Sequence, residues 1–162
     1  MSNAFLYRMP SGIPGDVSRK SQSTIESHHV GGQFAAFGLF GKLSATTGDF
    51  VPLESTDTAA AVYGLLVRAY PTQSAQNELG KAVPTASGIQ DALVRGYMTV
   101  KCNAGTAKKA GKVYVRVAAG TTAKPIGGIE AVADSTNTIE ITKAMFMHDA
   151  DAQGNVEISF NI

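Results

Sequence analysis

The strongest constraint on the fold of this 162-residue chain is that its apolar segments are short, and each ends at a glycine, a proline or another turn-forming residue. The last of them, NVEISFNI, places Val156, Ile158 and Phe160 on one side of an extended chain and polar residues on the other. A period of two residues is typical of a β-strand with one buried face. The chain contains seven to nine such segments, which predict an all-β fold, either a jelly-roll-like sandwich or a small β-barrel.

Two alternating segments, residues 96–102 and 112–117, enclose a sequence that looks at first like a phosphate-binding loop. A P-loop has four residues between its two glycines and a serine or threonine after its lysine. Here five residues separate Gly105 from Gly111, and Val113 stands where the hydroxyl is required. The sequence therefore predicts a solvent-exposed hairpin loop that joins two strands, and no nucleotide site.

The first 33 residues are rich in residues that interrupt regular structure, with two prolines and two glycines between residues 10 and 15. Such a segment cannot continue a helix, and it predicts an extended N-terminal arm with a sharp turn. A second interpretation, equally open from the residues alone, makes residues 5–8 the first strand of the barrel. Residues 34–162 are expected to form one β-barrel or jelly-roll domain, because a chain of 16.9 kDa buries enough surface for a single core.

The segment from residue 71 to residue 95 shows no clear alternation. Ser87 could cap a short helical turn that carries Ile89 and Leu93 and ends at Gly96. The alternative is a long loop, and long loops in compact domains are often functional.

The composition argues against partners that are held by charge. With 14 basic and 13 acidic residues the net charge is +1, which favours neither a nucleic acid nor a membrane surface as a partner. Charged residues make up 17% of the chain, below the roughly 25% usual for soluble domains, as in proteins whose surface is partly covered in an assembly. The single cysteine, Cys102, permits no intramolecular disulfide and is expected to be a buried apolar residue. No apolar run is long enough for a signal peptide or a membrane span, so a cytoplasm-like environment is expected until the protein leaves in a particle.

One segment resembles a calcium-binding loop. DADAQGNVE, which begins at Asp149, has carboxylates at its first and third positions and glycine at its sixth. The fifth position is Gln153 and the twelfth is Phe160, where such a loop requires a bidentate glutamate. The segment is therefore expected to be a hairpin turn between two strands.

The histidines show no arrangement that would bind a metal. His28 and His29 are neighbours, and neighbouring side chains of an extended chain point to opposite faces. His148 has no second ligand at a suitable spacing and is expected to be a surface histidine. No nucleophile motif such as G-x-S-x-G occurs. We therefore expect a binding or structural protein that is not an enzyme, with no catalytic residue, no metal site and no cofactor.

An ordered set of segments resembles the structural cement proteins of tailed bacteriophages, which are small decoration proteins on the outside of the capsid. The resemblance covers most of the chain, with residues 71–92 its least certain part. Its segments are SGIPGDVSR (residues 11–19), TIES, VYGLLVRAYP, the pair GYMTVKC and GKVYVRV, and GNVEISF. It implies a β-barrel or jelly-roll-like domain in the virion, on the capsid exterior, assembled in the host cytoplasm. The implied partners are the major capsid protein and another copy of the chain.

The arm is the expected contact with these partners, because an extended segment can add to a sheet edge or lie in a groove. Asp16 and Arg19 could pair with each other or reach a partner. Self-association is expected to give a two-fold dimer, with a trimer as the alternative. The candidate partner-binding residues, for the capsid or for a second copy, are Phe5, Tyr7, Arg8, Ile13, Pro14, Gly15, Asp16, Val17 and Arg19.

A carbohydrate-binding or receptor-binding β-domain of a phage surface structure is the alternative function. Such sites use exposed aromatic platforms, whereas this chain has no tryptophan and only five tyrosines. The composition therefore favours the cement function.

Overall fold

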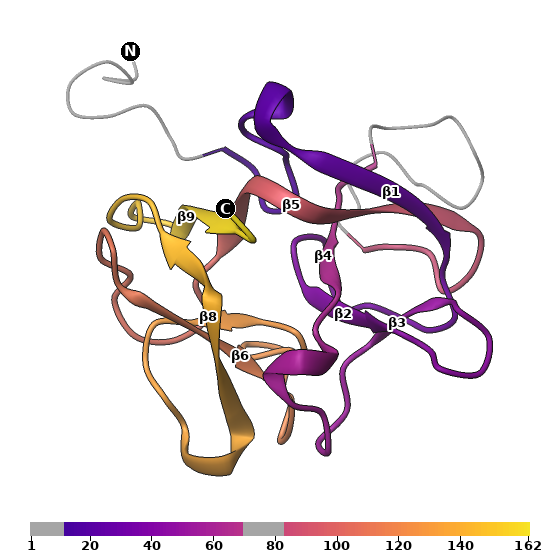
Figure 1. Cartoon of the computed structure of the whole chain (residues 1–162). Coiled ribbons are helices and arrows are strands. Elements are labelled where there is room, and N and C mark those ends of the chain that lie inside the picture. The colour runs from indigo at the N-terminus through magenta and orange to yellow at the C-terminus, as the bar shows by residue number, and fades with distance from the viewer. Residues whose placement is uncertain (1–11, 70–82) are drawn as a thin grey trace.

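The computed structural model describes residues 12–69 and 83–162, and within them it is all-β, with three short 3-10 helices (Figure 1). This confirms the predicted fold class. The strands are β1 (Thr24–His29), β2 (Phe40–Leu43), β3 (Phe50–Pro52), β4 (Gly64–Leu66), β5 (Ile89–Lys101), β6 (Lys112–Arg116), β7 (Ile129–Glu130), β8 (Thr138–Phe146) and β9 (Asn155–Phe160). The 3-10 helices are η1 (Lys20–Gln22), η2 (Ala59–Ala61) and η3 (Ser135–Asn137). In the described residues no helix is long and apolar enough to cross a membrane.

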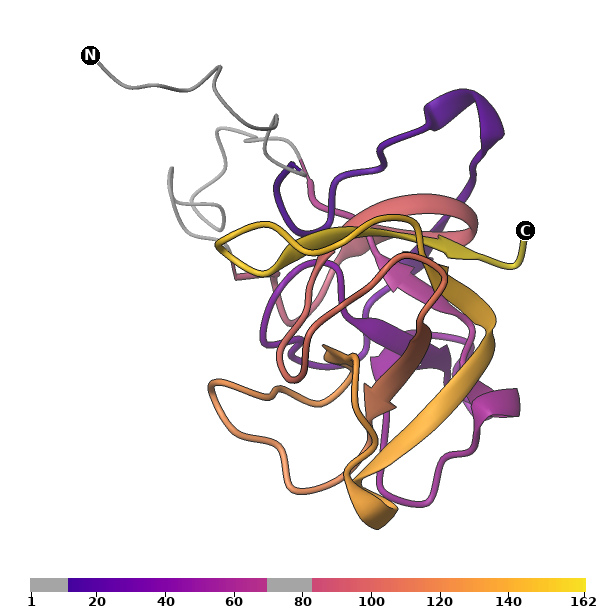
Figure 2. The same ribbon diagram turned by 90° about the vertical axis from the view of Figure 1, so that its left-hand side faces the viewer.

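The strands form one antiparallel, strongly curled sheet in the order β3-β2-β4-β5-β9-β8-β6-β7, with β1 also paired to β5. Figure 1 shows β1 lying along β5, and Figure 2 shows the gold β8 descending along one side of the molecule below the yellow β9. Parallel bridges join Val30 to Phe50 and Cys102 to Ile129, so each end of the sheet curls back on itself. The result is a barrel-like body.

Strand β5 connects the two halves of this body. Its first half pairs with β1 and β4, and its second half, from Gly96 onward, pairs with β9. Gly96 has a φ of +133°, a conformation that a residue with a side chain rarely adopts, and a Cβ there would lie 2.2 Å from Ser23 Oγ. Glycine therefore permits the bend at which β5 passes from one half to the other.

Two apolar cores lie on either side of this strand. The larger contains Met98 and Val100 together with residues of β6, β8 and β9, and the smaller contains Ala92 with the aromatic residues of loop 31–39. Phe40 and Phe160 meet edge to face with ring centroids 5.2 Å apart and join the strands of the two halves.

Two expectations about this region were wrong. Residues 89–95 form neither a helical turn capped by Ser87 nor a loop, because β1 and β4 pair with them from both sides. The segments 96–102 and 112–117 contain the predicted strands, but they do not form a hairpin, since β9 and β8 lie between β5 and β6. Alternation predicts the face of a residue and does not predict its partner strand.

The turn expected after Asp149 is confirmed. It joins β8 to β9, which pair with each other. The Asp151 carboxylate accepts hydrogen bonds from the backbone N–H groups of Gln153 (2.9 Å) and Asn155 (2.8 Å). The carboxylate thus organises the turn. Within residues 12–69 and 83–162, no group of three or more His, Cys, Asp or Glu residues is placed to hold a metal ion.

Candidate functional site

The described part of the expected arm, residues 12–19, packs against β5, and we call it the docked segment. Val17 forms an antiparallel bridge with Met98, and the Gly15 N–H donates to the Thr99 carbonyl oxygen at 2.8 Å. These backbone contacts place the segment beside the second half of β5, on the edge opposite to β9. The docked segment therefore extends the sheet by one short strand-like stretch.

A turn at Ile13–Asp16 reverses the chain just before this contact. The Asp16 N–H donates to the Ile13 carbonyl oxygen at 3.0 Å, and Gly15 occupies the left-handed region with a φ of +94°. Gly12 then lies against Thr99, because a Cβ on Gly12 would be 2.9 Å from Thr99 Oγ1. Thr99 alternates with the core residues Met98 and Val100 of β5, so Gly12 lies on the side of this strand that faces away from the larger core.

The end of the docked segment is fixed by a charged side chain on β9. Arg19 donates to both oxygens of Glu157, with its Nη2 2.7 Å from Oε2, and Ser18 Oγ donates to Oε1 at 2.6 Å. The Arg19 guanidinium also lies 4.1 Å from the centre of the Tyr97 ring. Arg19 thus pairs with Glu157, a residue that the sequence did not single out, and not with Asp16.

These contacts shift the pKa values of both partners. Burial alone would raise the pKa of Glu157, but the hydrogen bonds from Arg19 and Ser18 and the charge of Arg19 hold it below its ordinary value. The hydrogen bond to Glu157 raises the pKa of Arg19. Both groups are therefore charged at neutral pH, where the pair attaches the docked segment to β9.

The structure separates the candidate partner-binding residues into three groups. Phe5, Tyr7 and Arg8 lie outside the described residues. Gly15 is buried and Pro14, Asp16 and Val17 are half-buried, so these four position the docked segment on its own chain. Ile13 and Arg19 are exposed. Ile13 is 55% exposed, which makes it the apolar side chain of the docked segment that is most available to a partner.

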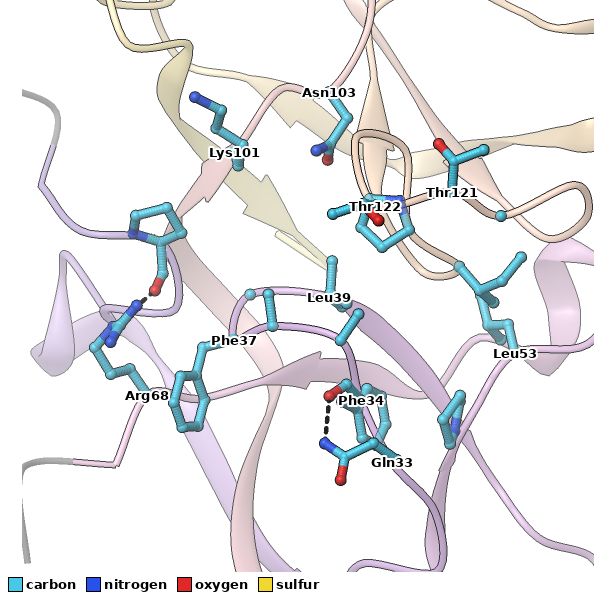
Figure 3. Close-up of a pocket in the computed structure, with 18 residues that line it drawn as sticks. Gln33, Phe34, Phe37, Leu39, Leu53, Arg68, Lys101, Asn103, Thr121 and Thr122 are labelled. Carbon is cyan, nitrogen blue, oxygen red and sulfur yellow. Dashed lines mark hydrogen bonds between the residues drawn. The ribbon is translucent and has the colours of Figure 1, made fainter. Parts of the chain in front are cut away.

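An open groove lies beside the docked segment, and its cavity volume is about 930 Å³ (Figure 3). One wall is loop 33–39 and the facing wall comes from residues 101–103 and 120–126. Phe37, Leu39 and Leu53 are among the apolar residues that line it. We call this cavity the apolar groove.

The apolar groove meets the docked segment at one end. Arg68 Nε donates to the Pro14 carbonyl oxygen at 2.9 Å, and both residues line the groove. The Arg68 guanidinium lies 5.0 Å from the Phe37 ring centre. The sequence did not predict this groove, because the apolar run from residue 34 looks like a strand, whereas β2 begins only at Phe40. The glycine at position 38 was the one sequence signal that this run bends, and in the structure Gly38 has a φ of +76°.

The other candidate residues have structural roles. His148 lies at the end of β8, where its Nδ1 is 2.7 Å from the Asp149 carbonyl oxygen and its Nε2 accepts the Glu157 N–H at 3.2 Å. It is half-buried, so the prediction of a surface histidine was wrong in part. Cys102 is half-buried too, and burial raises the pKa of its thiol, which disfavours the reactive thiolate.

The fold and the docked segment define a β-rich protein with a strand-like N-terminal segment added to its sheet, and comparisons with known proteins identify its class. A solved chain from "The capsid of Myoviridae Phage XM1" has the same fold, with a TM-score of 0.72 and 20% sequence identity over 99% of this chain and 97% of that one. The family model "XM1 gp53 minor capsid protein" matches residues 1–160, so the chain belongs to that family. None of the curated proteins matches the chain. The expected phage capsid family is thereby confirmed, and the protein is a virion component with a structural role in association with the capsid.

Proposed function

We propose that this capsid protein is a cement protein that binds the outer surface of a tailed-phage head, after assembly in the host cytoplasm, and clamps neighbouring capsomers against the pressure of packaged DNA. Its proposed partners are the major capsid protein and a second copy of the chain. Residues 1–33 act as the arm, whose strand β1 is also built into the sheet, and residues 34–162 complete the body. In this role the protein makes and breaks no covalent bond.

The observation that carries this proposal is the attachment of the docked segment to the body. Gly15 is bonded to β5 and Arg19 to β9, so the docked segment is fixed on the body at both of these positions. A load applied to residues before Gly12 is thereby transmitted to the sheet. A leading segment that was free of the body could not hold two capsomers at a fixed separation.

Pairing of two copies would strengthen such a clamp. If each copy of a two-fold dimer binds one capsomer, the second contact forms at the high effective concentration set by the first. The joint attachment then exceeds either single contact by about 10²–10⁴-fold, and each contact need only be modest. A dimer is favoured over a trimer because one surface patch serves both subunits.

The test is to mix purified protein with undecorated phage heads, sediment the heads, and measure how much protein travels with them. Wild-type protein is expected to bind at a saturable stoichiometry. Ile13→Asp is expected to weaken binding at least about tenfold, since burial of an isoleucine contributes roughly 1.5–3 kcal/mol. The matched control is Ile162→Asp, because Ile13 and Ile162 are similarly exposed, at 55% and 58%.

Two results would contradict the proposal. The first is an absence of saturable binding to heads, most clearly if the protein instead bound immobilised glycans, which would favour the carbohydrate-binding alternative. The second is equal binding by wild type and Ile13→Asp, which would remove the docked segment from the contact. Protease accessibility of the bound protein on intact heads tests the exterior location.

A further inference from the structure

We propose that the apolar groove is the site at which this protein holds an extended acidic segment of the major capsid protein, one that combines apolar side chains with at least one carboxylate. The inference rests on the proposed cement function, and it names both the surface and the chemistry of the contact with the shell. It adds a contact on the body of the protein to the contact expected at Ile13.

The groove is cationic at one end and has no acidic wall. Of the 18 described residues that line it, Arg68 and Lys101 are charged, and none is an aspartate or a glutamate. Figure 3 shows these two cations on one side of the cavity and Leu53 on the opposite side. A cavity that carries charges of one sign attracts a segment of the opposite sign.

Within the described residues, neither cation is neutralised by a carboxylate. Arg68 Nε donates to the Pro14 carbonyl oxygen, and Lys101 Nζ donates to the Gln153 carbonyl oxygen, so both hydrogen-bond partners are uncharged. A guanidinium can bind a carboxylate through two parallel hydrogen bonds, and its two terminal nitrogen atoms are suited to this geometry. Arg68 is therefore the residue that we expect to bind the carboxylate, with Lys101 adding positive charge beside it.

The remaining walls of the groove are apolar and preformed. Phe37, Leu39 and Leu53 lie on them, and the Phe34 ring stacks on the Phe50 ring with the ring centres 5.1 Å apart. The cavity volume of about 930 Å³ lies at the upper end of the roughly 300–1,000 Å³ usual for ligand pockets. A site that is already formed loses little conformational entropy on binding. These walls suit the apolar side chains of an extended segment.

The docked segment connects the groove to the proposed contact with the head. Pro14 lines the cationic end, and its neighbour Ile13 is 55% exposed. Thr99 and Lys101 share the face of β5 that is turned away from the larger core, and Gly12 lies against Thr99. A shell surface that covers Ile13 therefore lies next to the groove. This continuity is the reason for assigning the groove to the shell protein and not to a separate ligand.

The experiment measures the affinity of full-length variants for undecorated phage heads by sedimentation. Ala35 is an exposed residue of the groove wall, and it is replaced by glutamate in one variant and by lysine in another. An acidic occupant predicts that Ala35→Glu binds at least about tenfold more weakly than wild type, whereas Ala35→Lys binds at least as tightly. The matched control is Ala45→Glu, because Ala45 is exposed in the turn between β2 and β3 and does not line the groove.

A second pair of variants tests the cationic end of the groove. Lys101→Glu is expected to weaken binding to heads by at least about tenfold, because it places a negative charge beside the acidic segment. Lys143→Glu makes the same change of charge at an exposed position of β8 and is expected to bind like wild type. Both lysines are exposed, so both variants should fold, and urea unfolding checks this.

Three results would overturn the inference alone. Equal binding by wild type, Ala35→Glu and Lys101→Glu would remove the groove from the contact. Equal weakening by Ala35→Glu and Ala35→Lys would show that the contact does not depend on charge, which contradicts an acidic segment. A dimer of the free protein that Ala35→Glu dissociates in analytical ultracentrifugation would assign the groove to a second copy. Wild-type protein that fails to bind heads would instead refute the cement function, and the assigned occupant of the groove with it.

Discussion

At the scale of single residues, Gly15 shows how one position without a side chain holds the docked segment in place. Its amide bonds to Thr99 and its carbonyl oxygen accepts the Arg68 N–H at 2.9 Å. A Cβ at this position would lie 2.6 Å from the Phe37 Cβ, closer than such atoms approach. Any side chain would therefore push the docked segment away from the body.

Gly15→Ala is expected to lower the free energy of unfolding by about 2–5 kcal/mol, from left-handed strain of about 1–2 kcal/mol and from overpacking of about 1–3 kcal/mol. The matched control is Gly88→Ala. Gly88 has a similar φ of +103° but nothing within 4 Å of its Cβ position, so only the strain remains. Urea unfolding measures both changes. Equal losses would show that the contact with Phe37 contributes nothing.

The ion pair between Arg19 and Glu157 makes stability depend on pH. The folded-state pKa of Glu157 is below its ordinary value of 4.5, so its contribution is complete well above that pH and is lost as the pH falls through the folded-state pKa. Glu157→Gln is expected to cost about 1–2 kcal/mol near neutral pH, and the difference from wild type should shrink below pH 4.5.

A double-mutant cycle with Arg19→Gln isolates this pair. Because Arg19 is 43% exposed at its side chain, the coupling free energy should be modest but measurable near neutral pH. Urea unfolding of wild type, both single variants and the double variant at several pH values gives the coupling. A coupling near zero at neutral pH would mean that solvent screens the pair completely.

Single residues also show where sequence reasoning stops. The alternation of residues 112–117 puts Val113, Val115 and Val117 on one face, and all three are buried as that pattern predicts. It did not indicate that the opposite face of β9 is also buried, with Glu157 only 9% exposed. The side chains that bond to Glu157 are those of Ser18 and Arg19, which lie 139 and 138 residues away in the sequence. No local pattern encodes a contact of that separation.

At the scale of elements, a buried charge organises the loop that forms one wall of the apolar groove. Arg116 at the end of β6 is 2% exposed, and its Nε donates to Glu130 Oε1 on β7 at 2.6 Å. Its Nη2 donates to Asp134 Oδ2 at 2.6 Å, beyond β7. The hydrogen bond to Glu130 raises the pKa of Arg116. The guanidinium thus ties together both ends of the chain between β6 and η3.

Glu130→Gln is expected to destabilise the protein by about 3 kcal/mol, because it leaves a buried guanidinium with only Asp134 as a charged partner. Asp134→Asn is the control. Its side chain is 39% exposed, so its loss should cost clearly less than the loss of Glu130, which is fully buried. Unfolding in urea measures the free energy of unfolding of both variants. Urea is uncharged, so unlike guanidinium chloride it does not screen the ion pairs. A larger loss for Asp134→Asn would reverse the assigned importance of the two carboxylates.

Elements were predicted better than their pairing. The strands at residues 112–116 and 155–160 follow from alternation, and the β8–β9 turn follows from its Asp and Gly residues. The hairpin expected between residues 96–102 and 112–117 does not exist, because β9 enters from the end of the chain and pairs with β5. The pairing of strands depends on contacts between distant segments, which a single sequence does not specify.

At the scale of the whole molecule, the family and the all-β class could be read from the sequence, whereas the apolar groove could not. The ordered set of segments identified the phage capsid family, which the family model over residues 1–160 confirms. The groove is assembled from six separate parts of the chain, around residues 14, 33–39, 52–53, 68, 101–103 and 120–126. Only the folded arrangement brings these parts together.

Strand β5 contributes Ala92 to the smaller apolar core and Leu93, Met98 and Val100 to the larger one. Opening either core removes one side of this strand from its neighbours and weakens its hold on the other core. The two halves are therefore expected to open as one cooperative unit and not as separate local units. Proteolytic cleavage within residues 89–101 is therefore expected to unfold both halves together, and neither half is expected to fold as an isolated fragment.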